Sequence, residues 1–538
     1  MDSLFFFPRQ SLGSRCPGTN QPESTLEYRN ADQKPTEADQ KHLSRLGKCP
    51  RQILPTWGAM RSQGWCYYQK PPVCNWNFAV NILVAFLTGK RQLALMAGIM
   101  IAGSCLAQEN APPNGPAKVE LRQIDGRWQL YVNHQQFFVK GAGLEFGDQE
   151  KLAAAGGNSF RTWRTDNGHE TGRQILDRAQ KNGLYVAMGL AMATERQGFN
   201  YSDSNAVARQ LAEIKSQVLQ FKDHPALLVW DIGNELNLNS HNPAVWNAVN
   251  DVSKMIHQLD QNHPTTTSLA GINKELADQI KSRAPDLDFL SIQSYADIVN
   301  LPRELHDSGW NRPYLVTEWG ATGHWECGRT SWGAPIEDDS SVKASLYRKR
   351  YESAIASDST NCLGSYVFLW GQKQERTPTW YGMFLPFGQE TETVDVMQDI
   401  WTGHWPEFRS PQLKGFWLDG KTSYQNVHLN AGGNYMAKVL AQSPDHAALT
   451  YVWEIMEESQ AQSIGGDFES QPADLPGLVS GNSAGGAQIN APAKPGAYRL
   501  FVYALDNHGK GAYANIPFYV DTKSSTAETD AKVSLGRN

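Results

Sequence analysis

The chain has 538 residues, too many for one ordinary domain, and its 19% charged and 40% hydrophobic residues are typical of a folding chain rather than a disordered one. Lys and Arg number 49 against 55 Asp and Glu, which gives a net charge of −6. This balance argues against a nucleic-acid-binding protein, because such proteins usually carry a basic excess or stripe. The 17 Trp residues suit either a large apolar core or the flat faces of sugar rings.

Residues 1–107 differ from the rest of the chain, and we expect them to be a non-globular extension. Residues 1–75 show no lasting hydrophobic periodicity. Within residues 90–107, two basic residues precede the apolar run Leu93–Ala107, which ends in small residues and is too short to span a bilayer. Such a segment is typical of a secretory signal. We therefore expect an exported protein, periplasmic or extracellular, whose mature form begins near Gln108.

The position of this signal-like segment, well inside the chain, predicts that the sequence begins upstream of the native start. On this hypothesis residues 1 to 85 are not native protein; a genuine extension is the alternative. Cys105 follows Ala-Gly-Ser and would attach the protein to a membrane only if it carries a lipid. Cys327 and Cys362 are the cysteines after Gln108, and the sequence leaves open a disulfide or two separate buried thiols.

A regular alternation of strands and helices follows. Two strand patterns flank Asp125-Gly126 and predict a hairpin over Val119–Val132. Helical patterns, such as Thr171–Asn182 and Asn205–Lys222, separate eight short apolar strands. The eight strands are expected over Phe137–Ala142, Asn158–Trp163, Leu184–Leu190, Ala226–Ile232, Thr265–Leu269, Leu287–Gln293, Pro313–Glu318 and Leu363–Trp370. This repetition predicts a (β/α)8 TIM barrel of the α/β class over residues 117–405, rather than an open sheet.

A second domain is expected after a break at residues 403–411. Residues 410–521 are rich in strand patterns separated by turns, which predicts a small C-terminal β-sandwich, immunoglobulin-like or carbohydrate-binding-like. The expected strands are Leu413–Leu418, Asn426–Leu429, Leu449–Ile455, Tyr498–Leu505 and Tyr513–Val520. Trp417 and Tyr424 could bind glycan there or belong to the core. Residues 522–538 are polar and are expected to form a disordered tail.

Two expected barrel strands end in a carboxylate. The fourth strand runs into Asn234-Glu235, and the seventh runs into Glu318-Trp319-Gly320. Because the site of a TIM barrel lies at the C-terminal ends of its strands, we expect Glu235 and Glu318 to face each other there. Such a pair suits glycoside cleavage, in which one acid protonates the leaving oxygen and the other carboxylate attacks the anomeric carbon or activates water.

These motifs resemble clan A of the glycoside hydrolases. The barrel is most similar to the TIM-barrel domain of glycoside hydrolase family 2, as in the β-galactosidases and β-glucuronidases. Lys140–Gly143, Asn158–Trp163 and the aromatic segment Tyr366–Trp370 match the same pattern. The resemblance covers residues 117–405.

The resemblance implies a retaining mechanism and a role for each matched residue. Glu318 would be the nucleophile, and Glu235 would be the general acid and then the base. Arg161 would lie beside Glu318, Tyr295 would donate its hydroxyl to Glu318, and Asn234 would bind the sugar 2-hydroxyl. The expected substrate-contacting Trp residues are Trp370, as the floor under the reacting sugar, Trp163 and Trp319. The loops at the C-terminal ends of the strands also contain, or lie beside, Trp325, Trp332 and Trp380.

Simpler interpretations stay open for some of these residues. Arg161 could pair with a helix carboxylate, and Arg164 would then be the competing candidate for the position beside Glu318. Tyr295 and Trp370 could be core aromatics. His169, His324 and Glu326 are expected to be loop structure or sugar contacts. No Cys/His set has zinc spacing, so no metal and no cofactor are expected.

The sequence thus predicts a glycosidase that hydrolyses O-glycosyl compounds, acting on a β-linked poly- or oligosaccharide by double displacement. A retaining β-glucanosyltransferase on the same substrates is the alternative, because a sugar hydroxyl can intercept the covalent intermediate in place of water. A carbohydrate-binding envelope protein with an inactive barrel is the second alternative. The expected partner is the saccharide; neither nucleic acid nor a partner protein is implied.

Overall fold

The computed structural model of the chain describes residues 115–522, which lie within one compact unit. The expected signal, Cys105 and the tail beyond residue 522 lie outside the described residues. Within residues 115–522, no helix is both long and apolar enough to cross a membrane.

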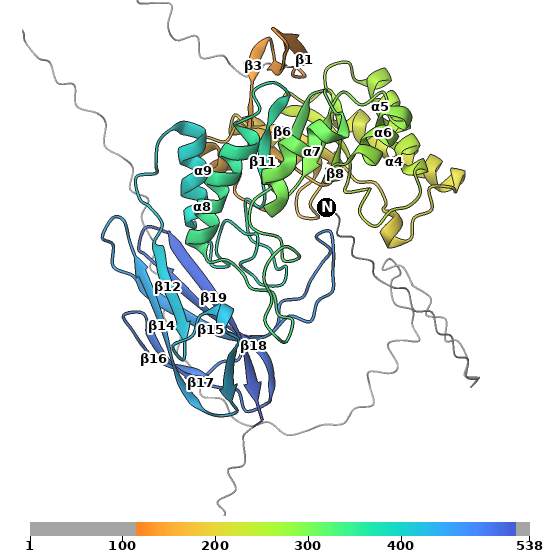
Figure 1. Cartoon of the computed structure of the whole chain (residues 1–538). Coiled ribbons are helices and arrows are strands. Elements are labelled where there is room, and N and C mark those ends of the chain that lie inside the picture. Colours follow the sequence, from red (N-terminus) through yellow and green to blue (C-terminus); the bar gives the residue numbers. More distant parts are fainter. Residues whose placement is uncertain (1–114, 523–538) are drawn as a thin grey trace, which may run out of the picture. The chain divides into compact units, whose positions relative to one another are not determined.

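Eight parallel strands close into a barrel in the order β10-β11-β4-β5-β6-β7-β8-β9 (Figure 1). They are β4 (Val139–Gly143), β5 (Ser159–Arg161), β6 (Tyr185–Leu190), β7 (Leu227–Asn234), β8 (Thr265–Ala270), β9 (Leu290–Gln293), β10 (Tyr314–Glu318) and β11 (Cys362–Val367). Nearly all of their residues are buried, as expected for strands covered on both faces. The prediction of a TIM barrel is confirmed.

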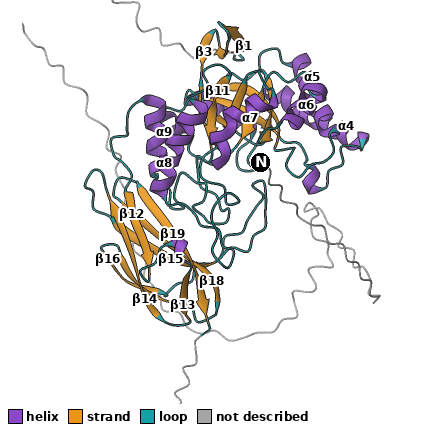
Figure 2. Cartoon of the chain, in the orientation of Figure 1, coloured by secondary structure: helices purple, strands orange, loops and turns teal. Residues whose placement is uncertain are grey.

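Helices cover the outside of this barrel (Figure 2). They are α2 (Gln149–Ala154), α3 (Gly172–Lys181), α4 (Ser204–Phe221), α5 (Ala244–Leu259), α6 (Lys274–Arg283), α7 (Leu301–Ser308), α8 (Ser340–Arg350) and α9 (Glu392–Thr402). Polar caps define several starts: Thr171 and Gln174 form a capping box at α3, and the Asp339 side chain accepts from two backbone amides at α8. After Arg350, α8 continues as five residues of π-helix, Tyr351–Ile355.

A three-stranded antiparallel sheet covers the amino ends of the barrel strands. It consists of β1 (Val119–Ile124), β2 (Arg127–Val132) and β3 (Gln135–Phe137). Its apolar side chains, such as Leu130 and Val132, share a core cluster with Leu228 and Leu315 at the beginnings of β7 and β10. The sequence assigned Phe137 to the first barrel strand, whereas the structure places it in β3 and begins β4 at Val139.

The C-terminal domain is a sandwich of two four-stranded sheets, as predicted, with the orders β12-β14-β17-β16 and β13-β19-β18-β15. The strands are β12 (Gln412–Leu418), β13 (Val427–Asn430), β14 (Asn434–Gln442), β15 (Thr450–Glu457), β16 (Val479–Ser483), β17 (Gly486–Asn490), β18 (Gly496–Leu505) and β19 (Gly511–Asp521). The sequence did not predict β14, β16 and β17. Along β14 only Ala437 and Val439 are fully buried, so the hydrophobic alternation there is weak.

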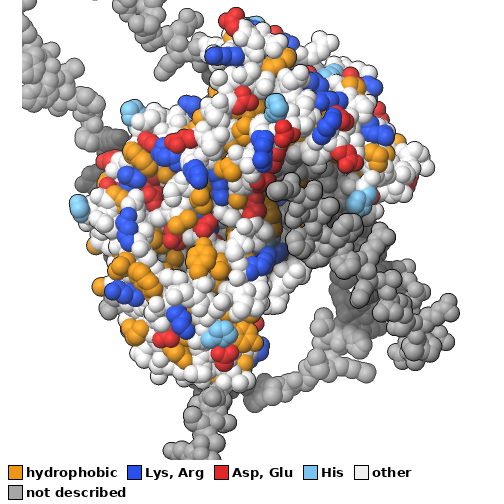
Figure 3. Space-filling view, in the orientation of Figure 1, with side chains coloured by type: hydrophobic (Ala, Val, Ile, Leu, Met, Phe, Trp, Pro, Cys, Tyr) orange, Lys and Arg blue, Asp and Glu red, His pale blue; other side chains and the backbone are white. Residues whose placement is uncertain are grey.

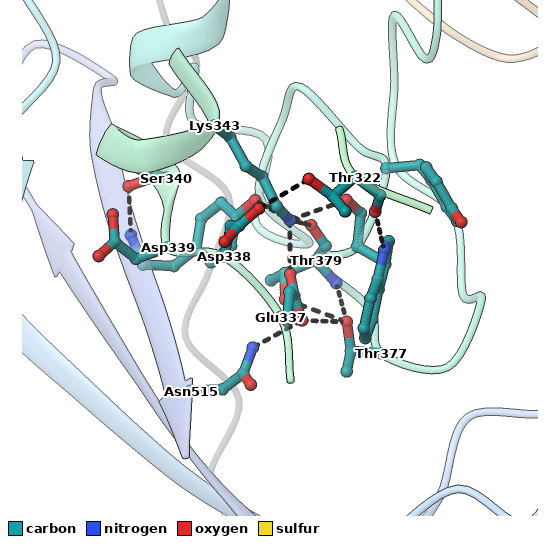
Figure 4. Close-up of polar contacts among 12 residues, drawn as sticks. Thr322, Glu337, Asp338, Asp339, Ser340, Lys343, Thr377, Thr379 and Asn515 are labelled. Carbon is teal, nitrogen blue, oxygen red and sulfur yellow. Dashed lines mark hydrogen bonds and ion pairs between the residues drawn. The ribbon is translucent and has the colours of Figure 1, made fainter. Parts of the chain in front are cut away.

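A buried polar network joins the two domains (Figure 4). Lys343 of α8 donates to Glu337 at 2.6 Å and to the hydroxyl of Tyr513, from β19, at 2.7 Å. Asn515 of β19 donates to the other oxygen of Glu337 at 2.6 Å. Both charges are buried and paired with each other within the barrel part. Because Tyr513 and Asn515 complete their hydrogen bonds from the other domain, the sandwich supports the long loop between β10 and α8 that precedes Lys343.

Acidic and basic side chains are interspersed over the face of the molecule that Figure 3 shows. No broad basic field is visible on that face, in keeping with the net charge of −6.

Candidate active site

The carboxylate of Glu318, the last residue of β10, is the centre of a converging set of donors. The Arg161 guanidinium and the Trp163 indole donate to its Oε1 at 2.7 and 2.8 Å. The Tyr295 hydroxyl donates to its Oε2 at 2.8 Å. Arg161 and Trp163 lie at the C-terminal end of β5, and Tyr295 lies at the C-terminal end of β9. In the barrel, β9 is the neighbour of β10 on one side, and β5 lies on the other side of β10 beyond β11 and β4. The three donors fix both oxygens of one buried carboxylate in a single orientation.

Arg161 bridges this carboxylate to β7. It is fully buried, and its Nη2 donates to Asp231 at 3.1 Å and to Asn234 Oδ1 at 3.0 Å. Asp231 also accepts from Ser268 at 2.7 Å, and burial raises its pKa in spite of the Arg161 cation. Arg161 therefore lies beside Glu318 rather than pairing with a helix carboxylate, while Arg164 pairs with Glu145 at the surface.

The amide of Asn234 is oriented by two donors. Its Oδ1 accepts from Arg161 and from Gln293 Nε2, the latter at 2.6 Å. An amide held through its oxygen presents its Nδ2 as a donor, and within the described residues that nitrogen has no hydrogen-bond acceptor. Asn234 can therefore donate to an oxygen of a bound molecule.

Glu235 follows β7 at an irregular point of the strand. The pairing of β7 with β8 shifts register between Asp231 and Asn234, and Glu235 has a φ of +49°. Residues other than glycine seldom adopt this left-handed conformation, and those that do cluster at functional sites. Burial and the neighbouring Glu318 raise the pKa of Glu235 to about 8. Its carboxyl is consequently protonated near neutral pH.

Aromatic rings surround Tyr295 at this end of the barrel. Phe368 lies 5.8 Å from Trp163 and 6.0 Å from Tyr295, measured between ring centroids, and Tyr381 lies 5.5 Å from Tyr295. Trp325, which is 56% exposed, meets Tyr295 edge to face at 5.4 Å. It therefore offers an open ring surface beside the hydroxyl that holds Glu318.

The loop carrying Trp325 is tied down by its neighbour Glu326. The Glu326 carboxylate accepts from the backbone amides of Gly323, Ala296 and Asp297 at 2.8, 2.9 and 3.1 Å. These contacts join the loops that follow β9 and β10, so Glu326 has the structural part that the sequence suggested. His324 is buried, contacts the Tyr381 hydroxyl at 3.0 Å, and has its pKa lowered to about 4 by burial and nearby cations.

The structure separates Trp319 and Trp370 from the other expected substrate contacts. Both side chains are 0% exposed. Trp319 packs against Tyr347 and Tyr351, and Trp370 packs against Phe384 and Trp401 while its indole donates to the Asp148 carbonyl at 3.0 Å. Neither ring offers surface to a substrate. Phe368, which directly follows β11 and precedes Trp370 by two residues, is the aromatic that lies among Trp163, Tyr295 and Tyr381.

Trp370→Ala should chiefly destabilise the fold. Removal of a fully buried Trp costs ~3–5 kcal/mol, which urea unfolding followed by circular dichroism would measure. Trp325→Ala is the matched control, because its exposed ring should change the unfolding free energy by less than about 0.5 kcal/mol. An unchanged urea midpoint for Trp370→Ala would contradict the core position.

Several residues near the two glutamates were missed in the sequence. Asp231 could have been found, because it is a lone charge within an apolar strand that the pattern already assigned to β7. Glu375 could not, since it lies in an irregular loop after β11. It is buried beside Lys373 at 2.9 Å and His324 at 3.8 Å. Burial raises the pKa of Glu375, and its charge adds to the rise in the pKa of Glu235.

The remaining candidates lie apart from this site or contribute only structure. Trp332 contacts His428 and Tyr519 of the sandwich, and the buried Trp380 donates to the Thr322 carbonyl. His169 contacts Phe146. Cys327 and Cys362 are free thiols. Among residues 115–522 no group of His, Cys, Asp or Glu side chains is arranged to hold a metal ion.

Residues 148–333 match the family model of the glycosyl hydrolases family 2, TIM barrel domain, in agreement with the resemblance seen in the motifs. A search of curated proteins gave no match.

Among solved structures, the chain is similar to a putative beta-galactosidase from Bacteroides fragilis, with 11% identity, a TM-score of 0.41 and coverage of 75% of this chain and 58% of that one. A Bifidobacterium dentium beta-glucuronidase complexed with coumarin-3-O-glucuronide has 16% identity, a TM-score of 0.42 and coverage of 53% and 49%. An FMN-binding beta-glucuronidase from Facaelibacterium prausnitzii L2-6 has 13% identity, a TM-score of 0.42 and coverage of 75% and 59%. The chain thus spans 49–59% of the length of these three proteins.

Proposed function

We propose that this chain, whose residues 148–333 match the family model of the glycosyl hydrolases family 2, TIM barrel domain, is a retaining glycosidase. It would cleave O-glycosidic bonds of a β-linked poly- or oligosaccharide by double displacement. The observation that carries the proposal is the pair Glu235 and Glu318 at the ends of β7 and β10. The Glu235 carboxyl keeps its proton near neutral pH, while the Glu318 side chain accepts hydrogen bonds from three donors, one of them the Arg161 guanidinium.

The different environments of Glu235 and Glu318 suit the two roles that the reaction needs, an acid and a nucleophile. In the first step the Glu318 carboxylate would attack the anomeric carbon while Glu235 gives its proton to the leaving oxygen. In the second step the ionised Glu235 would take a proton from water, which then attacks the glycosyl ester at Glu318. A carboxyl with a pKa of about 8 suits an acid that must be protonated at the start of each cycle.

Asn234 would supply a further contact to the reacting sugar. Its Nδ2 is the open donor of an amide whose oxygen is fixed by Arg161 and Gln293. Hydrogen bonds to the sugar 2-hydroxyl strengthen as the transition state develops positive charge at the ring. We therefore assign Asn234 to that hydroxyl.

The proposal is tested by following one cleavage by proton NMR. The protein is incubated with β-linked glucan, galactan and mannan oligosaccharides, and the anomer released first is recorded before it equilibrates in water. A β-anomer as the first product supports retention, whereas an α-anomer from a β-linked substrate would refute it. No release from any glycan of the panel, or from aryl glycosides, would count against a hydrolytic barrel.

Tyr295→Phe should lower kcat about 10- to 100-fold, because a hydrogen bond to a charged group contributes about 1.5–3 kcal/mol. The change removes the hydroxyl that donates to Glu318 and keeps the ring among its aromatic neighbours. Tyr381→Phe is the control, since its hydroxyl contacts His324 instead of Glu318. Steady-state rates on an aryl glycoside measure both variants, and equal losses in the two would contradict a special part for Tyr295.

We also propose that the protein is exported. The support is the apolar run Leu93–Ala107 with its preceding basic residues. Sequencing the N-terminus of the protein isolated from its native host tests this proposal: a start near Gln108 supports cleavage, and recovery of peptides from residues 1–75 would overturn it.

A further inference from the structure

A long excursion from the sandwich reaches the loops at the C-terminal end of the barrel. It comprises residues 458–473, between β15 and β16, and is called the strap below. Its two ends are close together, because Met456 pairs with Asp474 and the Leu475 amide donates to the Ile455 carbonyl. Figure 1 shows the strap as the blue loop that leaves the sandwich and extends to the barrel loops.

One side of the strap is anchored beside Glu235. Asp467 accepts from Arg196, which follows β6, at 2.6 and 3.1 Å, and from Gln197 at 3.0 Å. Gly465 lies against Arg196 and Leu238, so closely that a side chain there would meet Leu238 at 2.9 Å. The Leu238 amide in turn donates to the Glu235 carbonyl at 2.9 Å. The strap therefore touches the same turn that carries Glu235.

The other side of the strap is anchored on the loop after β11. Glu469, whose side chain is 0% exposed, accepts from the Arg376 amide at 2.6 Å and from its guanidinium at 2.8 Å. Lys373 donates to the Gly466 carbonyl at 2.9 Å, and its Nζ lies 5.9 Å from the Phe368 ring centroid. Since β7 and β11 are opposite strands of the eight-stranded barrel, the strap connects loops from opposite sides of the site.

Phe468 lies between these two anchors. Its neighbours in the chain, Asp467 and Glu469, are held by Arg196 and Arg376, yet the Phe468 side chain is 90% exposed. The backbone of this segment is tied down at both sides, so only the Phe468 side chain would have to be ordered when a ligand covers the ring. Flat apolar rings suit the faces of sugars, which expose C–H groups on one side.

We infer that the strap completes the substrate-binding site and that Phe468 binds the sugar units on the leaving-group side of the scissile bond. The side is assigned by contact: the strap touches the Glu235 turn, and Glu235 is the residue proposed to protonate the leaving oxygen. Phe468 is then a specificity-determining residue for chain length, supplied by the C-terminal domain. This inference rests on the proposed function.

Phe468→Ala tests the inference through two substrates. One is the β-linked oligosaccharide that the wild-type protein cleaves fastest, and the other is the matching glycosyl fluoride, whose leaving group is a single atom. We expect kcat/KM to fall about tenfold for the oligosaccharide, which corresponds to about 1.4 kcal/mol of lost binding, and to change less than twofold for the fluoride. Met436→Ala, an exposed apolar residue of the same domain, should change neither.

The other outcomes overturn the inference. Unchanged kinetics on both substrates would mean that the ring faces only solvent, and equal losses on both would mean that Phe468 supports structure. Failure of the proposed function is a distinct result, because the wild-type protein would then release no fluoride from any glycosyl fluoride. If the wild-type protein turns over both substrates and Phe468→Ala keeps the wild-type ratio of kcat/KM between the oligosaccharide and the fluoride, the proposed function stands and only the inference is refuted.

Discussion

Glu318→Ala should abolish turnover of every glycoside, because no covalent intermediate can form without the attacking carboxylate. The fold should survive this change, since Arg161 keeps its ion pair with the buried Asp231. Added azide should restore product formation by attacking the anomeric carbon from the vacated side. The recovered glycosyl azide should then have the inverted configuration, which NMR of the product would establish. Normal turnover by this variant, or inverted product from the wild-type protein, would show that Glu318 is not a nucleophile.

Glu235→Ala should behave differently, because the role proposed for this residue is only to donate and accept a proton. Natural glycosides and other substrates with poor leaving groups should lose most of their rate, roughly 10²–10⁴-fold, since departure of their oxygen requires protonation. Activated aryl glycosides should still form the intermediate, and azide should attack it to give a product of retained configuration. A series of aryl glycosides of graded leaving-group pKa measures the contrast. The same leaving-group dependence in both alanine variants would contradict the assignment of roles.

The pH profile provides a further check on the same residue. Since the pKa of Glu235 is raised to about 8, its carboxyl is protonated below that pH and ionised above it. The acid form is the one that can protonate the leaving oxygen, so kcat/KM for natural glycosides should fall as pH rises through about 8. Glu235→Gln, which cannot titrate, should lose this basic limb and serves as the control.

The proposed mechanism also predicts the distance between the carboxyl groups of Glu235 and Glu318. Retaining glycosidases place their carboxyls about 5–5.5 Å apart, whereas inverting enzymes leave about 6.5–9.5 Å for a water molecule. The charge of Glu318 contributes to the rise in the pKa of Glu235, and the retaining mechanism proposed here requires the shorter spacing. A crystal structure with a covalently trapped sugar on Glu318 would test both the spacing and the identity of the nucleophile.

The sequence was most informative where hydrophobic periodicity and strand ends coincide. The eight buried barrel strands are short apolar runs between polar helices, and that alternation was enough to locate all of them and to place Glu235 and Glu318 at their ends. The predictions that depended on the direction of a side chain were less accurate. β11 ends at Val367, and the chain then turns so that Phe368 lies among the site aromatics while Trp370 points into the core. A pattern of residue types does not record such a turn.

Other features depend on contacts between distant segments. The strap consists mostly of small and polar residues without periodicity, and its position is set by Arg196 and Arg376, which lie 271 and 93 residues away from their partners in the chain. Neither arginine stands out in the sequence. Strand β14 was missed because apolar residues such as Met436 and Leu440 lie on its exposed face and obscure the alternation, and β16 and β17 were missed because each has only five residues.

The buried network of Figure 4 limits how this chain can be divided or recombined. Lys343 and Glu337 belong to the barrel part, but Tyr513 and Asn515 of β19 complete their hydrogen bonds. A chain ending at Pro411 would keep the Lys343–Glu337 pair but would remove its hydrogen bonds with Tyr513 and Asn515, and leaving a buried polar group without a partner costs about 1–3 kcal/mol. Replacing the sandwich with another domain would therefore have to preserve the β19 contacts, or the barrel would lose this support.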